Sequence, residues 1–267
     1  MILNTPELIF LTVRYSSSRL PGKCLEKIGG ISVLEHVVMR AKSSGLTPII
    51  CTSIDLSDDV IALEASNLGV YCFRGSLKNK VERWRDCAEV LGAKFAHILD
   101  VDDPFFDVDE VVESINLFQN LNLDLLKTSM RSDSGFASVG MTTSFNFLEK
   151  MVKRARQLES EDLDVIPWQL ISQDSDKIGV MPDKFLINAE TQLRLTLDYP
   201  EDLELLNKLA IEFGPLGKRS DIETYLVKNS FLIEINRHRT QDFLNNKVVK
   251  LQDNFGVVKE MEGKAHA

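Results

Sequence analysis

Three cations, three serines and a proline–glycine turn lie within ten residues of one another near the N-terminus, in the run Arg14-Tyr-Ser-Ser-Ser-Arg19-Leu-Pro-Gly-Lys23. Arginine and lysine supply charge for an anion, and small residues such as Ser17 and Gly22 let backbone N–H groups approach it. A triphosphate, which carries several negative charges, needs this kind of cradle. The run lacks the G-x-x-x-x-G-K-[ST] spacing of a Walker A loop. The alternative interpretation is a solvated basic loop without a ligand.

A group of carboxylates follows an apolar run later in the chain. Asp100 and Asp102 are two residues apart, so on an extended strand both side chains point to the same side. They could share a metal ion, or one could face solvent at the end of the strand. Asp198 also follows an apolar run, and its simplest role is to cap the helix that comes next.

Short apolar runs alternate with segments of helical spacing through the first half of the chain. Strands are expected at Glu7–Val13, Pro48–Thr52, Val70–Phe73 and Phe95–Val101, and helices at Ser32–Ser43, Asp58–Leu68 and Val81–Leu91. This order favours an α/β fold with a mostly parallel sheet and helices on both faces. Ligands of such sheets bind at the carboxyl ends of the strands. The basic loop and the acidic cluster both follow strands, so they could meet there.

The second half of the chain is less regular. It is expected to contain a helix at Val108–Leu121, a strand at Leu123–Ser129, a polar substrate loop at Arg131–Thr143, a helix around Leu148–Leu158, a strand at Leu193–Leu197 and a helix at Leu203–Phe213. Arg131 and Ser138 are candidates for binding a second substrate, on position alone. We expect a single domain over residues 1–255 and a polar, disordered tail over 256–267.

Composition excludes several classes of protein. The chain has 267 residues, of which 44% are hydrophobic, and a net charge of −9, as in a globular protein without a general nucleic-acid surface. It has no apolar run of about 18 residues to span a membrane and no signal peptide, so we expect a cytoplasmic protein. Its four cysteines are far apart, which argues against a zinc site or a disulfide framework.

Several ordered motifs resemble one family. The run from Arg14 to Lys23 is similar to the signature loop of the bacterial cytidylyltransferases that make CMP-activated sugar acids, including the CMP-KDO synthetases and the family of spore coat polysaccharide biosynthesis protein F. Four later segments are also similar, in the same order: Leu34–Val38, Phe73–Ser76, Asp102–Pro104 and Arg194–Leu203. The resemblance covers roughly residues 7–235. It implies a Rossmann-like fold of the nucleotide-diphospho-sugar transferase type, which is GT-A-like.

This resemblance implies roles for individual residues. CTP would be bound by the N-terminal loop and one later arginine, through Arg14, Ser17, Arg19, Gly22, Lys23 and Arg74. Magnesium would be the cofactor, with Asp102 as a ligand, Asp198 as a second ligand or a holder of a ligating water, and Asp100 as an auxiliary ligand. Two separated aspartates suffice, because Mg²⁺ retains water and binds phosphate oxygens. Arg14, Lys23 and Asp102 would be the catalytic residues.

The implied reaction transfers CMP from CTP to a sugar acid or a similar or phosphorylated small molecule. Pyrophosphate is released, and the product serves cell-surface glycan biosynthesis. A homodimer is also expected from the resemblance. The sequence departs from the family at Val101, where a glycine is usual, and at Leu77–Val81, where an acidic pair is usual. Two alternatives stay open: a GT-A-type glycosyltransferase that uses Asp100 and Asp102 as a D-x-D motif, and a nucleotide-binding protein without catalysis.

Overall fold

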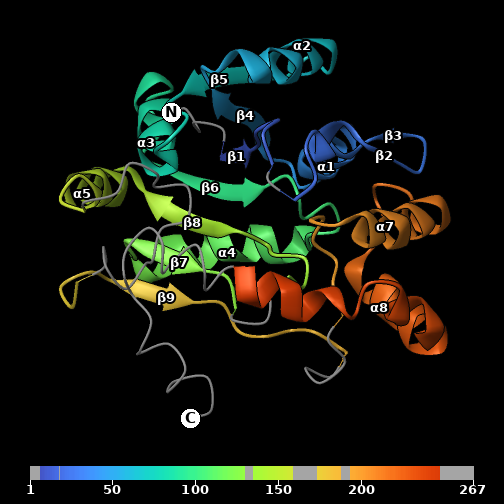
Figure 1. Ribbon diagram of the computed structural model, residues 1–267. Coiled ribbons are helices and arrows are strands. Elements are labelled where there is room, and N and C mark those ends of the chain that lie inside the picture. The colour runs from blue at the N-terminus through green and yellow to red at the C-terminus, as the bar shows by residue number, and fades with distance from the viewer. Residues whose placement is uncertain (1–6, 18, 130–134, 159–172, 188–192, 247–267) are drawn as a thin grey trace.

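A seven-stranded sheet forms the centre of the computed structural model, which describes residues 7–17, 19–129, 135–158, 173–187 and 193–246 (Figure 1). The strand order is β5-β4-β1-β6-β8-β7-β9. The strands are β1 (Leu8–Thr12), β4 (Thr47–Ser53), β5 (Tyr71–Gly75), β6 (Phe95–Asp100), β7 (Leu125–Lys127), β8 (Met141–Ser144) and β9 (Ile178–Val180), and the short strands β2 (Lys27–Ile28) and β3 (Ile31–Ser32) form a separate hairpin. All sheet pairings are parallel except those of β8 with β6 and β7.

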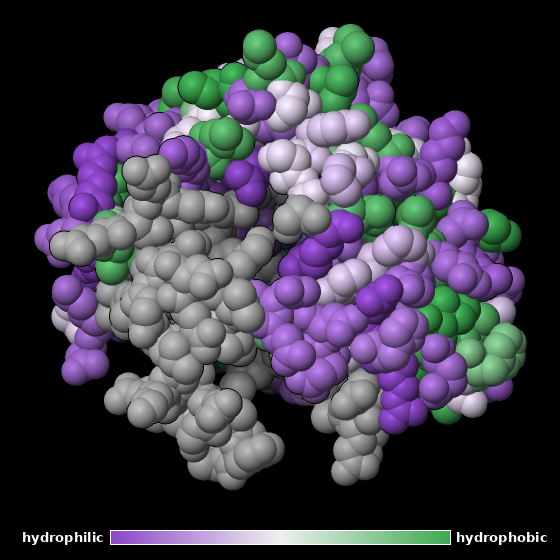
Figure 2. Space-filling model, viewed as in Figure 1, coloured by the Kyte–Doolittle hydropathy of each residue, from purple (hydrophilic) through white to green (hydrophobic). Residues whose placement is uncertain are grey.

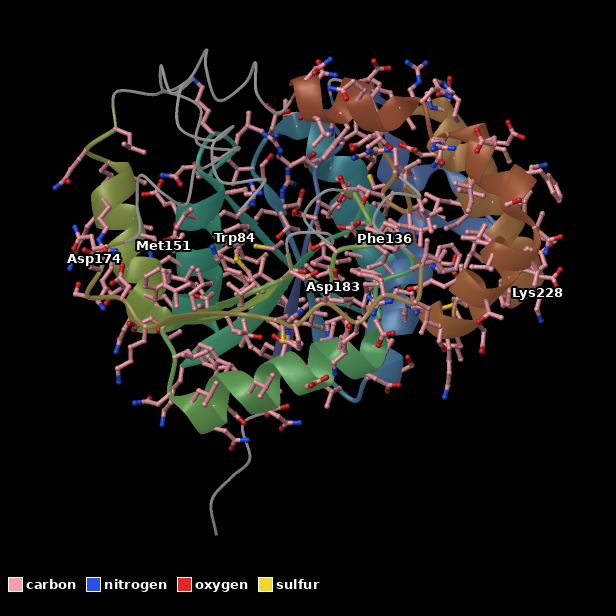
Figure 3. All side chains as sticks on the ribbon, turned by 90° about the horizontal axis from the view of Figure 1, so that it is seen from below. Trp84, Phe136, Met151, Asp174, Asp183 and Lys228 are labelled. Atoms are coloured by element: carbon pink, nitrogen blue, oxygen red, sulfur yellow. The ribbon has the colours of Figure 1, made fainter. Side chains whose placement is uncertain are left out.

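Helices cover both faces of this sheet, as the alternating sequence pattern predicted. The helices are α1 (Val33–Ser43), α2 (Asp59–Asn67), α3 (Lys80–Val90), α4 (Val108–Leu121), α5 (Phe145–Ala155), α7 (Pro200–Phe213) and α8 (Arg219–Lys228). Buried side chains of α1, α2, α4, α7 and α8 belong to one apolar core, and those of α3 and α5 belong to a second. In the view from below, Trp84 of α3 and Met151 of α5 lie on one side of the sheet and α4 lies on the other (Figure 3).

The strand β1 shows why both faces need cover. Ile9 and Leu11 pack into the core on the α1 side, while Phe10 between them packs into the core on the α3 side. All three are completely buried. A strand that is apolar on both faces is typical of a parallel sheet between two helical layers.

Strand register brings the predicted site loops together. Thr12, the last residue of β1, is opposite Cys51 of β4 on one side and Asp100 of β6 on the other. Because these three strands are parallel, the loops that follow them emerge at one edge of the sheet. The expectation that the basic loop and the acidic cluster meet at this edge is confirmed.

Two predicted elements differ in the structure. Residues 141–143, the last part of the predicted polar substrate loop Arg131–Thr143, belong to the strand β8 inside the sheet, where Thr142 and Thr143 are completely buried. Their hydroxyl groups are satisfied by partners such as His97 and the carbonyl of Asp124, so polar residues fit an interior strand. The segment Leu193–Leu197 forms no strand, although its backbone is hydrogen-bonded to Gly135 and Asp102.

Several other predictions fall partly outside the described residues. The predicted boundary between a domain and a tail at 255/256 and the acceptor candidate Arg131 both lie there. Within the described ranges, the helices lack the combination of length and apolar character that crossing a bilayer requires. One group of exposed apolar side chains lies at the top of the view in Figure 2, over α2 and β5, where Ile54, Leu56 and Leu63 are exposed.

Two buried histidines make stability depend on pH. His97 of β6 bonds Thr142 and the carbonyl of Val139, and burial lowers its pKa from 6.5 to about 4. Burial and then the charge of Arg40 lower the pKa of His36 from 6.5 to about 4. Between these values the unfolded chain binds protons that the folded chain does not, so stability falls as pH drops below 6.5.

We expect the free energy of unfolding, measured with urea between pH 6.5 and 5, to decrease by up to about 1.4 kcal/mol per pH unit for each of these histidines. A His36→Leu variant removes one of the two groups and should show a shallower slope. The same slope in the unaltered protein and in His36→Leu would contradict the assignment of His36 as buried and neutral.

Candidate active site

The basic loop leaves β1 and folds back on itself before a short 3₁₀ helix at Lys23–Leu25. The backbone N–H of Gly22 donates to the carbonyl of Tyr15 at 2.9 Å, which closes the loop. Gly22 has a φ of +72°, and a Cβ there would lie 3.1 Å from the Tyr15 ring. Glycine is therefore required by both the backbone conformation and the contact. The hydroxyl of Ser17 accepts a long bond from the N–H of Leu20 at 3.5 Å.

A buried carboxylate anchors this loop to β4. Asp58 is completely buried, and it accepts bonds from the backbone N–H of Tyr15 at 2.7 Å and the hydroxyl of Thr52 at 2.9 Å. It also accepts from the backbone N–H and hydroxyl of Ser53 at 3.0 and 2.5 Å. Four donors therefore satisfy the oxygens of this buried carboxyl group. The start of the loop is thereby fixed relative to the end of the neighbouring strand.

Lys23 lies at the point where the predicted acidic residues converge. Its ammonium donates to Oδ2 of Asp102 at 2.6 Å, to Oδ1 of Asp198 at 3.0 Å and to the carbonyl of Leu197 at 2.7 Å. Burial acts to lower the pKa of Lys23, but the two carboxylates outweigh it and raise that pKa above its ordinary value. Asp102 and Asp198 lie 79 and 175 positions after Lys23 in the sequence, and both carboxylates meet at its ammonium group.

Asp198 is surrounded by cations. Besides Lys23, its Oδ1 accepts from Arg19 at 2.5 Å and its Oδ2 accepts from Arg194 at 3.2 Å. Burial acts to raise the pKa of Asp198, but Lys23 and Arg19 lower it to about 2. The alternative in which Asp198 caps α7 is wrong, because the N-cap of that helix is Tyr199, whose backbone N–H donates to the carboxylate of Asp202 in the first turn.

A second pair of contacts fixes the distance between the two aspartate segments. The N–H of Leu197 donates to the carbonyl of Asp102 at 2.7 Å. Next to it, the hydroxyl of Thr196 donates to the carboxyl of Asp103 at 2.5 Å. Burial and then the charge of Asp102 raise the pKa of Asp103 well above its ordinary value. Adjacent backbone and side-chain bonds therefore hold the turn after β6 against the segment before α7.

A buried ionic network that was not predicted from the sequence lies behind Asp198. Arg194, Asp202 and Asn236 are all completely buried. Arg194 donates through Nε to Asp202 at 3.2 Å, and Asn236 donates to Asp202 at 2.8 Å and to the carbonyl of Arg194 at 3.0 Å. Arg194 and Asp202 both lie in a segment that the sequence analysis had singled out. Their spacing of four residues on either side of Asp198 was the available signal.

Two further candidates, Arg14 and Arg74, contact other groups. Arg14 donates to the carbonyl of Leu77 at 3.1 Å. Arg74 donates to the carbonyls of Ser53 and Asp55, at 2.9 and 2.8 Å, and pairs with Asp59 at 2.7 Å. These bonds hold the turn after β4, and the structure does not bring Arg74 to Lys23. Its role as a nucleotide ligand stays a prediction.

Asp100 is separated from Asp102 by the end of a strand. The strand β6 ends at Asp100 and the chain turns at Val101, so the alternation expected from period-two spacing does not reach Asp102. The Asp100 side chain is half exposed and lies 4.0 Å from the ammonium of Lys80, whereas Asp102 faces Lys23. Of the two alternatives, the structure therefore agrees with the one in which one aspartate, here Asp100, faces solvent at the end of the strand.

Asp102 and Asp198 are the residues here that suit a divalent cation. Among the described residues, no group of three or more histidine, cysteine, aspartate or glutamate side chains is arranged to hold a metal. However, the carboxylates of Asp102 and Asp198 converge on one cationic nitrogen, that of Lys23. Mg²⁺ takes one or two carboxylates and completes its shell with water and phosphate oxygens, so this donor set fits it.

Solved structures define the class of fold. A cytidylyltransferase from Leptospira borgpetersenii superposes with a TM-score of 0.75 at 23% identity, covering 85% of this chain and 95% of the other. A CMP-KDO synthetase (CMP:2-keto-3-deoxy-manno-octonic acid synthetase) complexed with CTP superposes with a TM-score of 0.55 at 16% identity, covering 78% of this chain and 99% of the other. The chain therefore has the nucleotide-diphospho-sugar transferase type of fold.

Sequence comparison identifies the family. Residues 8–229 match the family described as cytidylyltransferase, and the chain belongs to that family. An uncharacterized protein of Methanocaldococcus jannaschii is 26% identical, over 86% of this chain and 94% of the relative. Spore coat polysaccharide biosynthesis protein SpsF of Bacillus subtilis is 24% identical, over 80% of this chain and 89% of the relative. The predicted family and fold are confirmed, and the chain is a nucleotidyltransferase.

Proposed function

We propose that this enzyme transfers CMP from CTP to a sugar-acid-like or phosphorylated small molecule and releases pyrophosphate, in the biosynthesis of a surface glycan. The observation that carries the proposal is the convergence of Arg19, Lys23, Asp102 and Asp198 at the carboxyl edge of the sheet. Cations of the N-terminal loop suit a triphosphate, and the two carboxylates suit the magnesium that accompanies it. Membership of the cytidylyltransferase family supports CTP as the nucleotide.

The protein residues act by position and charge. An oxygen of the acceptor attacks the α-phosphorus in line with the departing pyrophosphate, so the chain does not need a nucleophile of its own. Arg14, Arg19 and Lys23 hold the triphosphate and stabilise the charge that develops on it. Asp102 and Asp198 would hold Mg²⁺, which would supply further charge to the phosphate oxygens. Lys23 would then be released from these carboxylates to act on the phosphates.

The arrangement supports a nucleotidyltransferase better than a glycosyltransferase with a D-x-D motif. Asp100 and Asp102 contact two different lysines, Lys80 and Lys23, rather than one point in space. A D-x-D motif would instead use the pair together at one metal ion and a nucleotide-sugar diphosphate. The basic loop is also in direct contact with Asp198 through Arg19 and Lys23, which suits a free triphosphate.

The test is pyrophosphate release with each of four nucleoside triphosphates and a panel of acceptors. The acceptors should include octulosonic and nonulosonic acids, sugar phosphates and small phosphonates. We expect release with CTP and one class of acceptor, at least about tenfold faster than with the other nucleotides, and its loss when EDTA removes magnesium. Equal rates with all four nucleotides, or release that EDTA does not affect, would contradict the proposal.

A further inference from the structure

A helical segment beyond the family match contacts the candidate site. The cytidylyltransferase match ends at residue 229, whereas residues 239–246 form a helix at the end of the last described range. This helix is the reddest ribbon in Figure 1. No element and no site residue was predicted in this segment from the sequence.

Three tethers attach this segment to the first turn of α7, directly after Asp198. Arg239 donates to both carboxylate oxygens of Glu201, at 2.9 and 3.1 Å. Asn246 donates to the hydroxyl of Tyr199 at 3.1 Å. Just before the helix, the buried Asn236 donates to Asp202, as described above. The helix is therefore held against the site at its first residue, at its last described residue and through Asn236 before it.

Phe243 brings an aromatic face to two guanidinium groups at the site. Its ring centroid is 5.6 Å from Cζ of Arg19 and 4.8 Å from Cζ of Arg194. These two arginines bond the opposite oxygens of Asp198. The Tyr199 ring is 5.8 and 5.6 Å from the same two carbons. Cations at such distances from an aromatic face are attracted to it, more strongly where water is excluded.

Arg19 retains hydrogen-bonding capacity in this arrangement. Its Nη2 bonds Asp198, whereas its Nε is buried and has no hydrogen-bond partner within the described part of the chain. A buried N–H donor without a partner is unfavourable. A phosphate oxygen would satisfy it with a charge-assisted bond. The Arg19 side chain is still 23% exposed, so it is accessible to a ligand.

We propose that Phe243 is a positioning residue for the nucleotide site: its ring holds the Arg19 guanidinium against Asp198, with free donors for the triphosphate. This inference rests on the proposed function, because it assigns Arg19 to a triphosphate. It also makes the helix at residues 239–246 part of the site, although it lies outside the family match. Leucine at position 243 keeps an apolar side chain but lacks the aromatic face that attracts the cation.

The test is calorimetric titration of the full chain with CTP and magnesium. Phe243→Leu is expected to weaken binding about five- to tenfold, and Phe243→Tyr, which restores the ring, less than twofold. Phe231→Leu makes the same change at an exposed position and is the matched control, because the Phe231 side chain is 68% exposed. In an Arg19→Ala background, Phe243→Leu should have no further effect, since the residue it acts through is gone.

A second measurement separates this inference from the proposed function. The measurement is the NMR chemical shift of the Nε–Hε proton of Arg19, a resonance that is assigned by its loss in Arg19→Lys. This chemical shift should change in the nucleotide-free Phe243→Leu protein and not in Phe231→Leu. If this proton shifts but the unaltered protein binds no CTP, the contact is correct and the proposed function is wrong. If CTP binds with equal affinity to the unaltered protein and Phe243→Leu, or if the weakening persists without Arg19, the positioning role is overturned.

Discussion

Replacement of Lys23 by methionine is expected to lower kcat/KM for nucleotidyl transfer by about 10²- to 10³-fold, the range typical for loss of one preorganised group that stabilises transition-state charge. Lys23 is the group on which Asp102 and Asp198 converge, and no other described lysine contacts both carboxylates. Methionine preserves most of the length of the side chain but cannot bear the charge. The measurement is initial-rate kinetics with CTP and the acceptor identified from the panel.

Two observations keep this result interpretable. Lys27 lies four residues later and is exposed, so Lys27→Met is a matched control that should retain full activity. Asp198 keeps Arg19 and Arg194 as partners when Lys23 is replaced, so we expect the fold to survive, which thermal unfolding can check. If the Lys23→Met protein is folded and within threefold of the original activity, Lys23 has no catalytic role.

Replacement of Asp102 by asparagine is expected to abolish magnesium-dependent turnover, with a loss of at least about 10²-fold at saturating magnesium. Asparagine is close in shape but removes the negative charge that attracts the ion. Asp102 is also partly exposed and its carbonyl, not its carboxylate, bonds Leu197. The backbone contact that positions the turn is therefore retained, and the loss can be attributed to the carboxylate.

Asp100→Asn is the matched comparison for this variant. Asp100 is two residues away and its side chain faces Lys80 at 4.0 Å rather than Lys23. We expect its removal to change turnover by no more than a few-fold. Titrating magnesium for both variants measures the difference. Full magnesium-dependent activity in Asp102→Asn, or an equal loss in both variants, would show that the metal ligand has been assigned to the wrong residue.

The sequence was informative where a property is local. The basic loop and the strand before it are adjacent in the chain, and the apolar runs of the first half have clear periods. The edge of the sheet at which Lys23 and Asp102 meet followed from the rule that parallel strands end together. The predicted α/β fold was accordingly correct in its first half.

The contacts that could not be foreseen are long-range. No local pattern pairs Thr196 with Asp103, which are 93 residues apart, or places Phe243 over Arg19. The strand β8 was missed because its buried threonines satisfy their hydroxyl groups inside the sheet, and periodicity rules read such residues as polar. Arg194 was missed because a charged residue is seldom completely buried unless it is paired. Its partners are Asp198 and Asp202, four and eight residues later in the chain.

The central claim is that the loop from Arg14 to Lys23 binds the triphosphate of CTP beside a magnesium ion on Asp102 and Asp198. A crystal structure of the enzyme with magnesium and a non-hydrolysable CTP analogue tests it most directly. We predict phosphate oxygens within hydrogen-bonding distance of Arg19 and Lys23, and an octahedral ion with ligand distances of about 2.1 Å bound to at least Asp102. A nucleotide bound elsewhere, or a triphosphate whose contacts omit Lys23, would contradict the account.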